Sequence, residues 1–305
     1  MAENPSGSWA WAARPWVTRM AEFSGTELTS IRSPRVKAAR ALGKRALRLR
    51  ARSFLAEGPQ AVGEALARDG VVTELFLTAA ARSRHGGMAA QASRQGAAVH
   101  VVSGEVMAEL AQTVTPQGIL AVCRFVDVPL AALIEAAPRL VVVLANVRDP
   151  GNAGTVLRTA DAAGAGGVIF SDASVDPYNS KCVRASAGSI FHTDLVLGGP
   201  VADTVSQLRA AGLRVLAADG RTGQSLDQVE PRGVFAGPTA WLFGNEAWGL
   251  PDDLLALADE PVAVPIYGQA ESLNLAAAAA VCLYASARAQ RCSAGGGCHT
   301  VPATR

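Results

Sequence analysis

The feature that most constrains the fold of this chain is an uninterrupted apolar run at 140–145, half of it valine. Such a run is typical of a strand in a parallel sheet, where helices cover both faces. Strand-like and helix-like segments alternate after it, with strands predicted at 168–170, 213–217, 239–243 and 262–266 and helices at 153–164, 179–187, 201–211, 251–258 and 272–290. This alternation predicts an α/β fold with a mostly parallel sheet.

The first half of the chain alternates in the same way. Strands are predicted at 53–56, 71–77, 98–102 and 119–125, with helices at 60–67 and 105–111. A length of 305 residues favours two domains. The predicted units are a disordered extension (1–27), a first domain (28–126), a linker with a short helix (127–139), a second domain (140–290) and a disordered tail (291–305). Met20 is a candidate start of the protein.

Composition removes several classes of protein. Half of the residues are hydrophobic and 18% are charged, which is typical of a globular chain. No apolar run approaches the roughly 18 residues that a membrane span needs. Five cysteines without a C-x-x-C pair, and no signal-peptide layout, predict a reduced, cytoplasmic setting. Cys292, Cys298 and His299 are weighed as a metal-binding tail, but a flexible Gly-rich terminus is favoured.

The chain lacks the common enzyme motifs. No G-x-G-x-x-G follows a strand, and there is no G-x-x-x-x-G-K-[ST], H-E-x-x-H or G-x-S-x-G. The four histidines form no ligand pair. Dinucleotide-dependent dehydrogenases, P-loop enzymes and zinc hydrolases are therefore disfavoured, and no metal is expected.

Charge is distributed unevenly along the chain. The basic arm, residues 28–56, holds nine basic and no acidic side chains, whereas the rest carries a net charge of −7 within a total of +2. A helix is predicted to begin at Ser33-Pro34, with Arg40, Lys44, Arg48 and Arg52 along one side. This pattern favours phosphate binding over a solvated charged face. The expected RNA contacts are Arg35, Lys37, Arg40, Lys44, Arg45 and Arg48.

Three loops follow predicted strands, where a parallel sheet places its ligands. In the first, Asn152 is the predicted cap of a helix, and Arg158 lies six residues into that helix. In the second, Gly244 and Gly249 bracket Glu246, and Gly244 allows a close approach of the main chain to a ligand. In the third, Ser272 is the predicted cap of the last helix. A capped surface loop and an exposed loop acid remain the alternatives.

At these loops the chain resembles the SpoU (TrmH-type) family of S-adenosylmethionine-dependent RNA 2′-O-methyltransferases, in the SPOUT superfamily. The family's three motifs resemble 152–160, 243–250 and 265–274, in that order. A further element, a basic residue followed by Ala-Ser-x-Gly, corresponds to Arg184 through Gly188. The resemblance covers about 140–290. The N-terminal half resembles the family's substrate-binding domain, a small α/β/α module, in the segments 33–37, 54–58 and 113–118.

The two halves together resemble bacterial 23S rRNA ribose methyltransferases, including the thiostrepton-resistance type. The resemblance implies an RNA (ribose-2′-O-)-methyltransferase of the EC 2.1.1 class that uses S-adenosyl-L-methionine. It also implies a trefoil knot in the C-terminal domain and a homodimer whose subunits share the active site. A tRNA methyltransferase and a non-catalytic RNA-binding or ribosome-assembly protein remain the alternatives. The modified nucleotide, and a housekeeping or antibiotic-resistance role, are left open.

The resemblance also assigns roles to residues. Arg158 is the central catalytic residue, assisted by Asn152, Glu246, Ser272 and Asn274, and Arg184 contacts the substrate or the cofactor. Main-chain groups at Gly244, Val264, Ile266, Leu273 and Val215 are the candidates for binding the cofactor. Because a guanidinium stays protonated at ordinary pH, we expect Arg158 to bind a phosphate or oxyanion, with proton transfer through it as the alternative.

Overall fold

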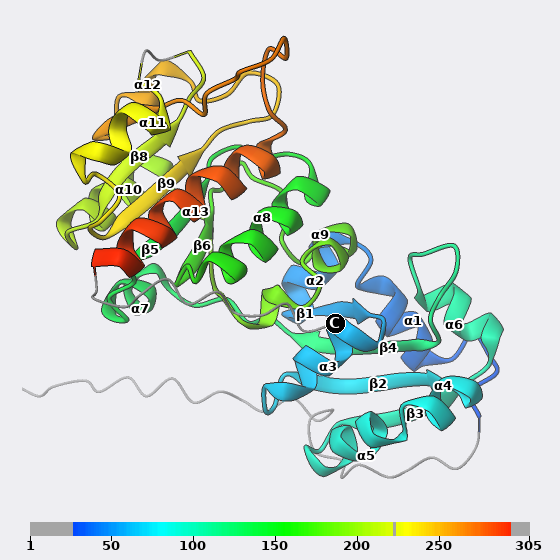
Figure 1. Ribbon diagram of the computed structural model, residues 1–305. Helices are drawn as coiled ribbons and strands as arrows, with labels where there is room; N and C mark the ends of the chain where they lie inside the picture. The colour runs from blue at the N-terminus through cyan, green and yellow to red at the C-terminus, as the bar shows by residue number, and fades with distance from the viewer. Residues whose placement is uncertain (1–26, 222–223, 294–305) are drawn as a thin grey trace, which may run out of the picture.

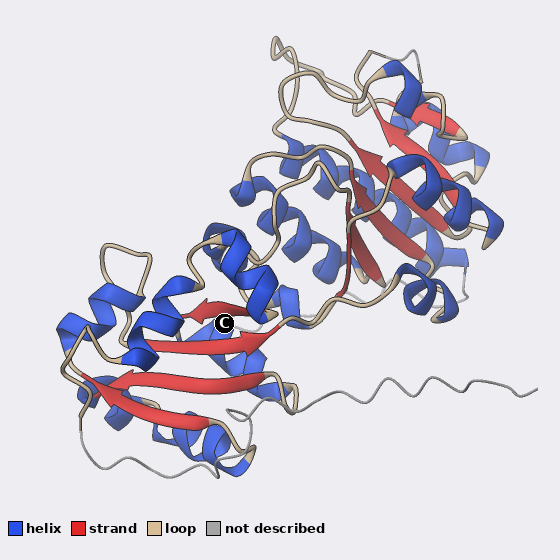
Figure 2. Cartoon of the chain, turned by 180° about the vertical axis from the view of Figure 1, so that it is seen from behind, coloured by secondary structure: helices blue, strands red, loops and turns tan. Residues whose placement is uncertain are grey.

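The computed structural model describes residues 27–221 and 224–293, and it shows two lobes, each built on its own sheet (Figures 1 and 2). Met20, Cys298 and His299 lie outside the described residues.

The N-terminal lobe is a four-stranded sheet with the strand order β1-β4-β2-β3, in which β4 is antiparallel to both of its neighbours and β2 is parallel to β3. Its strands are β1 (Ser53–Glu57), β2 (Val72–Thr78), β3 (Ala98–Val102) and β4 (Ile119–Arg124). Its helices are α1 (Pro34–Ala41), α2 (Arg45–Ala51), α3 (Pro59–Ala67), α4 (Ala79–Arg84), α5 (Gly86–Arg94) and α6 (Gly104–Leu110). Side chains of α1 and α6 pack on one face of the sheet, and those of α3, α4 and α5 pack on the other, which confirms the α/β/α arrangement.

The C-terminal lobe is a six-stranded sheet in which every pairing is parallel, in the order β10-β8-β9-β5-β6-β7. Its strands are β5 (Leu140–Leu144), β6 (Gly167–Phe170), β7 (Asp194–Leu197), β8 (Arg214–Ala218), β9 (Thr239–Phe243) and β10 (Glu260–Val262). Its longer helices are α8 (Pro150–Ala163), α10 (Val201–Ala210) and α13 (Leu275–Ser293). Its shorter ones are α7 (Leu130–Glu135), α9 (Ser180–Ala185), η1 (Ser189–Phe191), α11 (Leu226–Val229), η2 (Glu230–Arg232) and α12 (Asp252–Leu255).

Alternation along the strands builds the two sides of this core. In β5, Val142 and Leu144 face the layer of α8 and α13, whereas Val141 and Val143 face the layer of α7, α10 and α12. The indole of Trp241 donates a buried hydrogen bond to Ser286 Oγ (2.9 Å), which ties β9 to α13. The all-apolar run is therefore a strand covered on both sides, as predicted.

Several predicted bounds were wrong. The strand expected at 262–266 lies earlier, at Glu260–Val262, and the final helix begins at Leu275 and continues to Ser293, past the predicted domain end at 290. Strand β7 and helices α4, α5 and α11 were not predicted. These elements are short, and their sequences carry little periodicity of their own.

The basic arm does not form one helix. The chain turns at Gly43 and divides the arm into α1 and α2, and a Cβ at Gly43 would lie 2.8 Å from the side-chain amide of Gln112. Arg52 ends α2 in a left-handed conformation. The predicted row of four basic residues on one helix face is therefore wrong.

Arg48 is a buried residue that joins the two lobes. Its guanidinium donates to Asp176 Oδ2 at 2.6 and 3.0 Å and to the carbonyls of Leu42 and Gly43 at 2.9 Å. Arg48 is 3% exposed and Asp176 is 8% exposed. With its charge paired and its side chain covered, Arg48 is not available to RNA, and we remove it from the predicted RNA contacts.

An aromatic cluster with residues from both lobes lies next to this ion pair, since the main-chain N–H of Tyr178 donates to Asp176 Oδ1 (2.9 Å). Tyr178 stacks on Phe125 with ring centroids 3.8 Å apart and lies 4.6 Å from Phe54. Its buried hydroxyl accepts hydrogen bonds from the main-chain N–H groups of Val126 and Asp127. The lobes thus share a desolvated interface and are not joined by a linker alone.

We expect Arg48→Ala to lower the free energy of unfolding by about 3–5 kcal/mol, because it leaves the Asp176 carboxylate buried without its partner. Arg45→Ala, an exposed position on the same helix, should change it by less than about 0.5 kcal/mol. Urea unfolding of both variants measures the difference. Equal stability of the two variants would contradict the structural role of Arg48.

Candidate functional site

Two loops meet at the point where the strand order of the parallel sheet reverses. From β5 the chain proceeds to β6 and β7 on one side, whereas β9 and β8 lie on the other. Ligands bind at the carboxyl ends of strands that flank such a switch point. Here these ends lead into the loop after β5, which contains Arg148 and Asp149, and the loop after β9, which contains Glu246.

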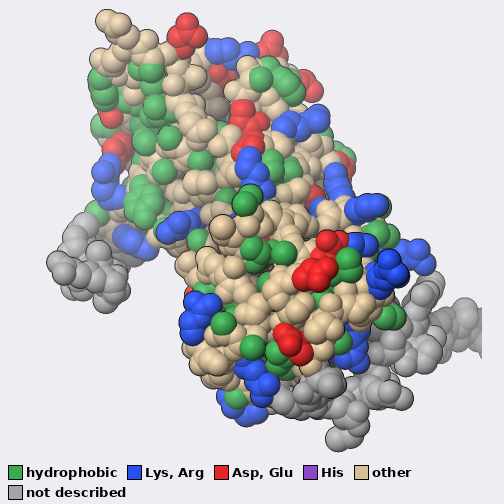
Figure 3. Space-filling model, turned by 90° about the vertical axis from the view of Figure 1, so that its right-hand side faces the viewer, with side chains coloured by type: hydrophobic (Ala, Val, Ile, Leu, Met, Phe, Trp, Pro, Cys, Tyr) green, Lys and Arg blue, Asp and Glu red, His purple; other side chains and the backbone are tan. Residues whose placement is uncertain are grey.

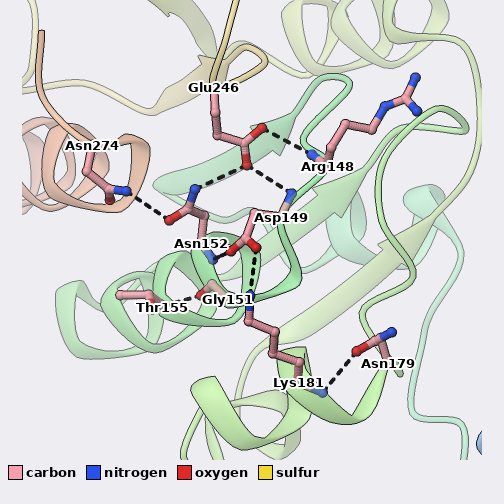
Figure 4. Close-up of polar contacts among 9 residues, drawn as sticks. All are labelled: Arg148, Asp149, Gly151, Asn152, Thr155, Asn179, Lys181, Glu246 and Asn274. Carbon is pink, nitrogen blue, oxygen red and sulfur yellow. Dashed lines mark hydrogen bonds and ion pairs between the residues drawn. The ribbon is translucent and has the colours of Figure 1, made fainter.

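Glu246 bonds the two loops together (Figure 4). Its carboxylate accepts hydrogen bonds from the main-chain N–H groups of Arg148 (3.2 Å) and Asp149 (3.1 Å). It also accepts one from the side-chain amide of Asn152 (3.2 Å). Glu246 is an exposed loop acid, as the alternative describes, but its carboxylate also links the two loops.

A third segment joins through Asn274. Its side-chain amide donates to Asn152 Oδ1 (3.0 Å), and its own Oδ1 accepts from the main-chain N–H of Ala276. Asn274, not Ser272, therefore caps α13, which corrects the prediction. Ser272 lies two residues earlier in an exposed stretch and has no hydrogen-bond partner among the described residues.

Asp149 is a member of the site that the sequence analysis missed. Its carboxylate accepts from the N–H of Asn152 (2.8 Å), so Asp149, not Asn152, caps α8. It also pairs with Lys181 Nζ of α9 (2.7 Å). The signal was present, because an Asp directly before a proline at the first helical position is a common helix start. Nothing local in the sequence indicates Lys181.

Both carboxylates are held in the ionised form. Partial burial acts to raise the pKa of Glu246, but the N–H donors on its oxygens outweigh burial and lower that pKa below its usual value. The hydrogen bond from Lys181 and the N–H of Asn152 lower the pKa of Asp149. The site thus presents two fixed negative charges at the start of α8, where the helix dipole favours them.

Two glycines of the site allow close chain approaches. A Cβ at Gly244 would lie 2.3 Å from the carbonyl carbon of Gly249, so only glycine fits this turn. A Cβ at Gly154 would lie 2.4 Å from the carbonyl oxygen of Cys182, where α8 crosses α9. Asn245 adds a further link that was not predicted, because its side-chain amide donates to the carbonyl of Asn146 (2.8 Å).

The two predicted arginines lie in different settings. Arg158 is exposed on α8 and pairs with no described residue. Its position, six residues after Asn152, places it about 9 Å further along the helix axis, outside the Glu246 network. Arg184 Nη1 is buried without a hydrogen-bond partner in the described part of the chain and lies 3.9 Å from Glu57 Oε2 of the N-terminal lobe.

Some of the predicted cofactor-binding positions are accessible in the structure, whereas one is buried. Ile266 and Leu273 are partly exposed in the loop before α13. Within the described residues, the main-chain groups of 264–273 form no hydrogen bond. Val215 is different, because it lies near the amino end of β8, is fully buried, and bonds Asp259 through its N–H and C=O. The structure therefore excludes Val215 from the cofactor set.

The exposed basic side chains reach both lobes. Lys37, Lys44 and Arg45 are exposed and unpaired among the described residues, whereas Arg40 pairs with Glu109 and Arg35 lies 3.3 Å from a ring nitrogen of His100. On the face shown in Figure 3, Lys and Arg side chains are spread over both lobes. Within 27–221 and 224–293 no group of three or more His, Cys, Asp or Glu residues can hold a metal ion, and no helix is long and apolar enough to cross a membrane.

We expect Glu246→Gln to lower the free energy of unfolding by about 1 kcal/mol at neutral pH, since charge-assisted hydrogen bonds at a partly exposed site are lost. The pKa of Glu246 is lowered in the folded state, so this advantage of the wild type is present above the ordinary carboxyl pKa and is lost as pH falls through the folded one. Thermal unfolding between pH 3 and 7 measures it. Glu271→Gln, in an exposed loop, is the control. A difference that persists unchanged at pH 3 would refute this assignment.

The chain is similar to known proteins over both lobes. Residues 139–284 match the model of the SpoU rRNA Methylase family, and residues 33–121 match the MRM3-like substrate binding domain. The chain is 33% identical to a 23S rRNA (guanosine(2553)-2′-O)-methyltransferase, RlmP, of Bacillus subtilis, over 85% of this chain and 98% of the relative. It is 32% identical to the RlmB 23S rRNA (guanosine-2′-O-)-methyltransferase of Bordetella pertussis, over 71% and 89%.

Solved structures show the same similarity. The AdoMet-bound rRNA methyltransferase of Sinorhizobium meliloti superposes with a TM-score of 0.74 at 32% identity, covering 86% of this chain and 97% of the other. The SpoU methyltransferase AviRb of Streptomyces viridochromogenes, in complex with the cofactor AdoMet, gives 0.71 at 30%, covering 85% and 99%. The similarity extends over both lobes and includes the loops that Glu246, Asn152 and Asn274 join. The chain belongs to the SpoU rRNA methylase family.

Proposed function

We propose that this protein transfers a methyl group from S-adenosyl-L-methionine to a ribose 2′-hydroxyl of 23S rRNA. The observation that carries the proposal is the hydrogen-bonded set Asn152, Glu246 and Asn274, which joins the three motif loops at the switch point of the sheet. Relatives that match both lobes are named 23S rRNA 2′-O-methyltransferases, and this supports an rRNA substrate.

The loop before α13 fits an adenosylmethionine ligand. Its main-chain N–H and C=O groups at Val264, Ile266 and Leu273 are free to bond the adenine and the methionine ends, because they form no hydrogen bonds within the described chain. Gly244 brings the second loop close without a side chain in the way. Two structures similar to this one are of proteins bound to AdoMet. When bound, this cofactor supplies an electrophilic methyl group.

The protein's task is to position the ribose and to stabilise the charge that develops on its oxygen. We assign this role to Arg158, whose guanidinium is exposed and unpaired among the described residues. We assign Asn152, Glu246 and Asn274 to positioning, since their polar atoms bond one another and hold the start of α8 in place. Ser272 and Arg184 remain candidates for contacting the substrate.

The N-terminal lobe supplies RNA affinity in this proposal. Lys37, Lys44 and Arg45 are exposed cations on or beside α1 and α2, and they suit contacts to phosphates. We retain the predicted bounds 28–126 for the first domain, and we extend the second domain from 140–290 to the end of α13 at Ser293. An rRNA substrate also implies a cytoplasmic location.

We further propose a homodimer and a knotted C-terminus, as the resemblance implies. After the edge strand β10 the chain runs through 263–274 and returns as α13 to pack on β5, β8, β9 and α8, a path compatible with a knot. Its outer side exposes Val281 and Tyr284, at 43% and 52%, a surface suited to a second copy. Sedimentation equilibrium of the full chain should give twice the chain mass of 31.4 kDa. A single-chain mass at micromolar concentration would remove the dimer from the proposal.

We expect labelled methyl transfer from S-adenosylmethionine to rRNA, mapped to a single ribose. Arg158→Ala should reduce the rate about 100-fold or more, because one preorganised donor to the developing charge is lost. Arg209→Ala, an exposed arginine on the opposite layer of the sheet, should retain the wild-type rate. Cofactor binding without transfer to any RNA would indicate the non-catalytic alternative, and transfer to tRNA alone would overturn the rRNA assignment.

We expect Gln substitution of Lys37, Lys44 and Arg45 together to weaken RNA binding and to reduce the slope of log K against log salt by about 2–3. Cofactor affinity should not change, because these residues lie on the other lobe. Filter binding between 50 and 300 mM salt, roughly the range in which such contacts respond, measures the slope. An unaltered slope would show that the basic arm is only a solvated surface.

A further inference from the structure

His192 lies between the two lobes, directly after η1, and contacts an acidic residue from each. Its Nδ1 lies 2.9 Å from Asp161 Oδ2 of α8, and its Nε2 lies 3.0 Å from Glu64 Oε2 of α3. A neutral imidazole has one N–H and one lone pair, so it can donate to only one carboxylate. With both carboxylates ionised, the two contacts are satisfied together only by the doubly protonated, positively charged ring.

The surroundings of His192 leave these two acids as its only charged contacts in the described chain. The main elements packed against η1 are α3, α8 and β7. Their charged residues are Glu64 on α3, Arg158 and Asp161 on α8, and Asp194 on β7, with Arg68 just after α3. Arg68 donates instead to the carbonyl of Phe191 (3.1 Å), a second bond between the lobes beside the ring.

The local backbone is shaped for this contact. Gly188 has a φ of +99°, and a Cβ there would lie 2.5 Å from Glu64 Cγ. The glycine that ends the Arg184–Gly188 element therefore leaves the space in which the stem of Glu64 crosses to His192. On α8, Asp161 is three residues after Arg158, so it lies about one turn further along the same helix.

We propose that the protonated His192 is a positioning residue, a clamp that holds α3 of the RNA-binding lobe against the helix that carries Arg158. While His192 contacts both Glu64 and Asp161, RNA bound to the N-terminal lobe is held in a fixed position relative to Arg158. Loss of the ring proton releases one carboxylate and weakens the tie between the lobes. The hydrogen bond with Asp161 is the main cause that raises the pKa of His192 above its usual value, and Glu64 adds to it.

The direction of the pH effect follows from this. The clamp is complete below the ordinary histidine pKa and is lost as pH rises through the raised pKa of His192. We expect the wild-type KM for RNA to increase about threefold to tenfold across that transition, the range of two partly exposed ion pairs. Cofactor affinity, and kcat at saturating RNA, should show no such transition.

The kinetic test compares the full-length wild type with His192→Gln, Glu64→Gln and Asp161→Asn between pH 6 and 9. Each variant should show the raised KM at low pH and no added transition, and the ratio of variant to wild type cancels the pH dependence of the chemistry. His192→Arg keeps a charge at every pH and should restore a low KM throughout. His85→Gln, in the N-terminal lobe, is the matched control. An unchanged KM in His192→Gln at pH 6 would overturn the proposal.

The kinetic readout rests on the proposed function, so a second measurement does not use it. NMR titration of the histidine ring protons, with His192 assigned by its absence in His192→Gln, should show His192 titrating above the ordinary histidine range in the wild type. It should shift toward that range in Glu64→Gln and in Asp161→Asn. An ordinary titration in the wild type would refute the clamp whether or not the protein methylates RNA, whereas absent methyl transfer with a raised titration would count against the proposed function alone.

Discussion

The carboxylate of Glu246 is the interaction on which the site depends. It solvates the N–H groups of the loop after β5 and thereby bonds that loop to the one after β9. These loops follow the paired strands β5 and β9 at the switch point of the sheet, where folds of this kind bind their ligands. Asn152 donates to Glu246 and accepts from Asn274, at the start of α13. The carboxylate of Glu246 therefore connects the loops after β5 and β9 to the segment before α13, although the three are distant in the sequence.

The second constraint is the desolvated junction between the lobes. Arg48 and Asp176 are buried together, and Asp176 also accepts a hydrogen bond from the main-chain N–H of Tyr178, whose ring packs on Phe54 and Phe125. Such a junction gives the N-terminal lobe a defined orientation toward α8. His192 also joins the two lobes, through its contacts with Glu64 and Asp161, and it is more exposed than Arg48 and Asp176. In our proposal, protonation of His192 changes the strength of this second connection between the lobes.

Much of the fold was predictable because the parallel strands are apolar on both faces and the helices between them are periodic. The site was predictable in part. Asn152, Glu246 and Asn274 were identified by their motifs and do meet, but Asp149 took the capping role expected of Asn152, and Asn274 that expected of Ser272. The prediction that Val215 binds the cofactor was wrong, because Val215 lies near the amino end of β8 and its main-chain N–H donates to Asp259. Short helices and the edge strand β7 derive their structure from packing that no local pattern records.

The sequence by itself determined the alternating architecture, the family motifs and the concentration of positive charge in the basic arm, since these depend on residue type and spacing. Only the tertiary structure decided which of those residues are free. Arg48 is removed from solvent by Asp176, 128 residues later in the chain, and Arg40 is paired with Glu109. The sequence determines which side chains are charged. Whether a charged side chain is free to contact a ligand depends on long-range partners, because burial and pairing arise only when distant segments pack together.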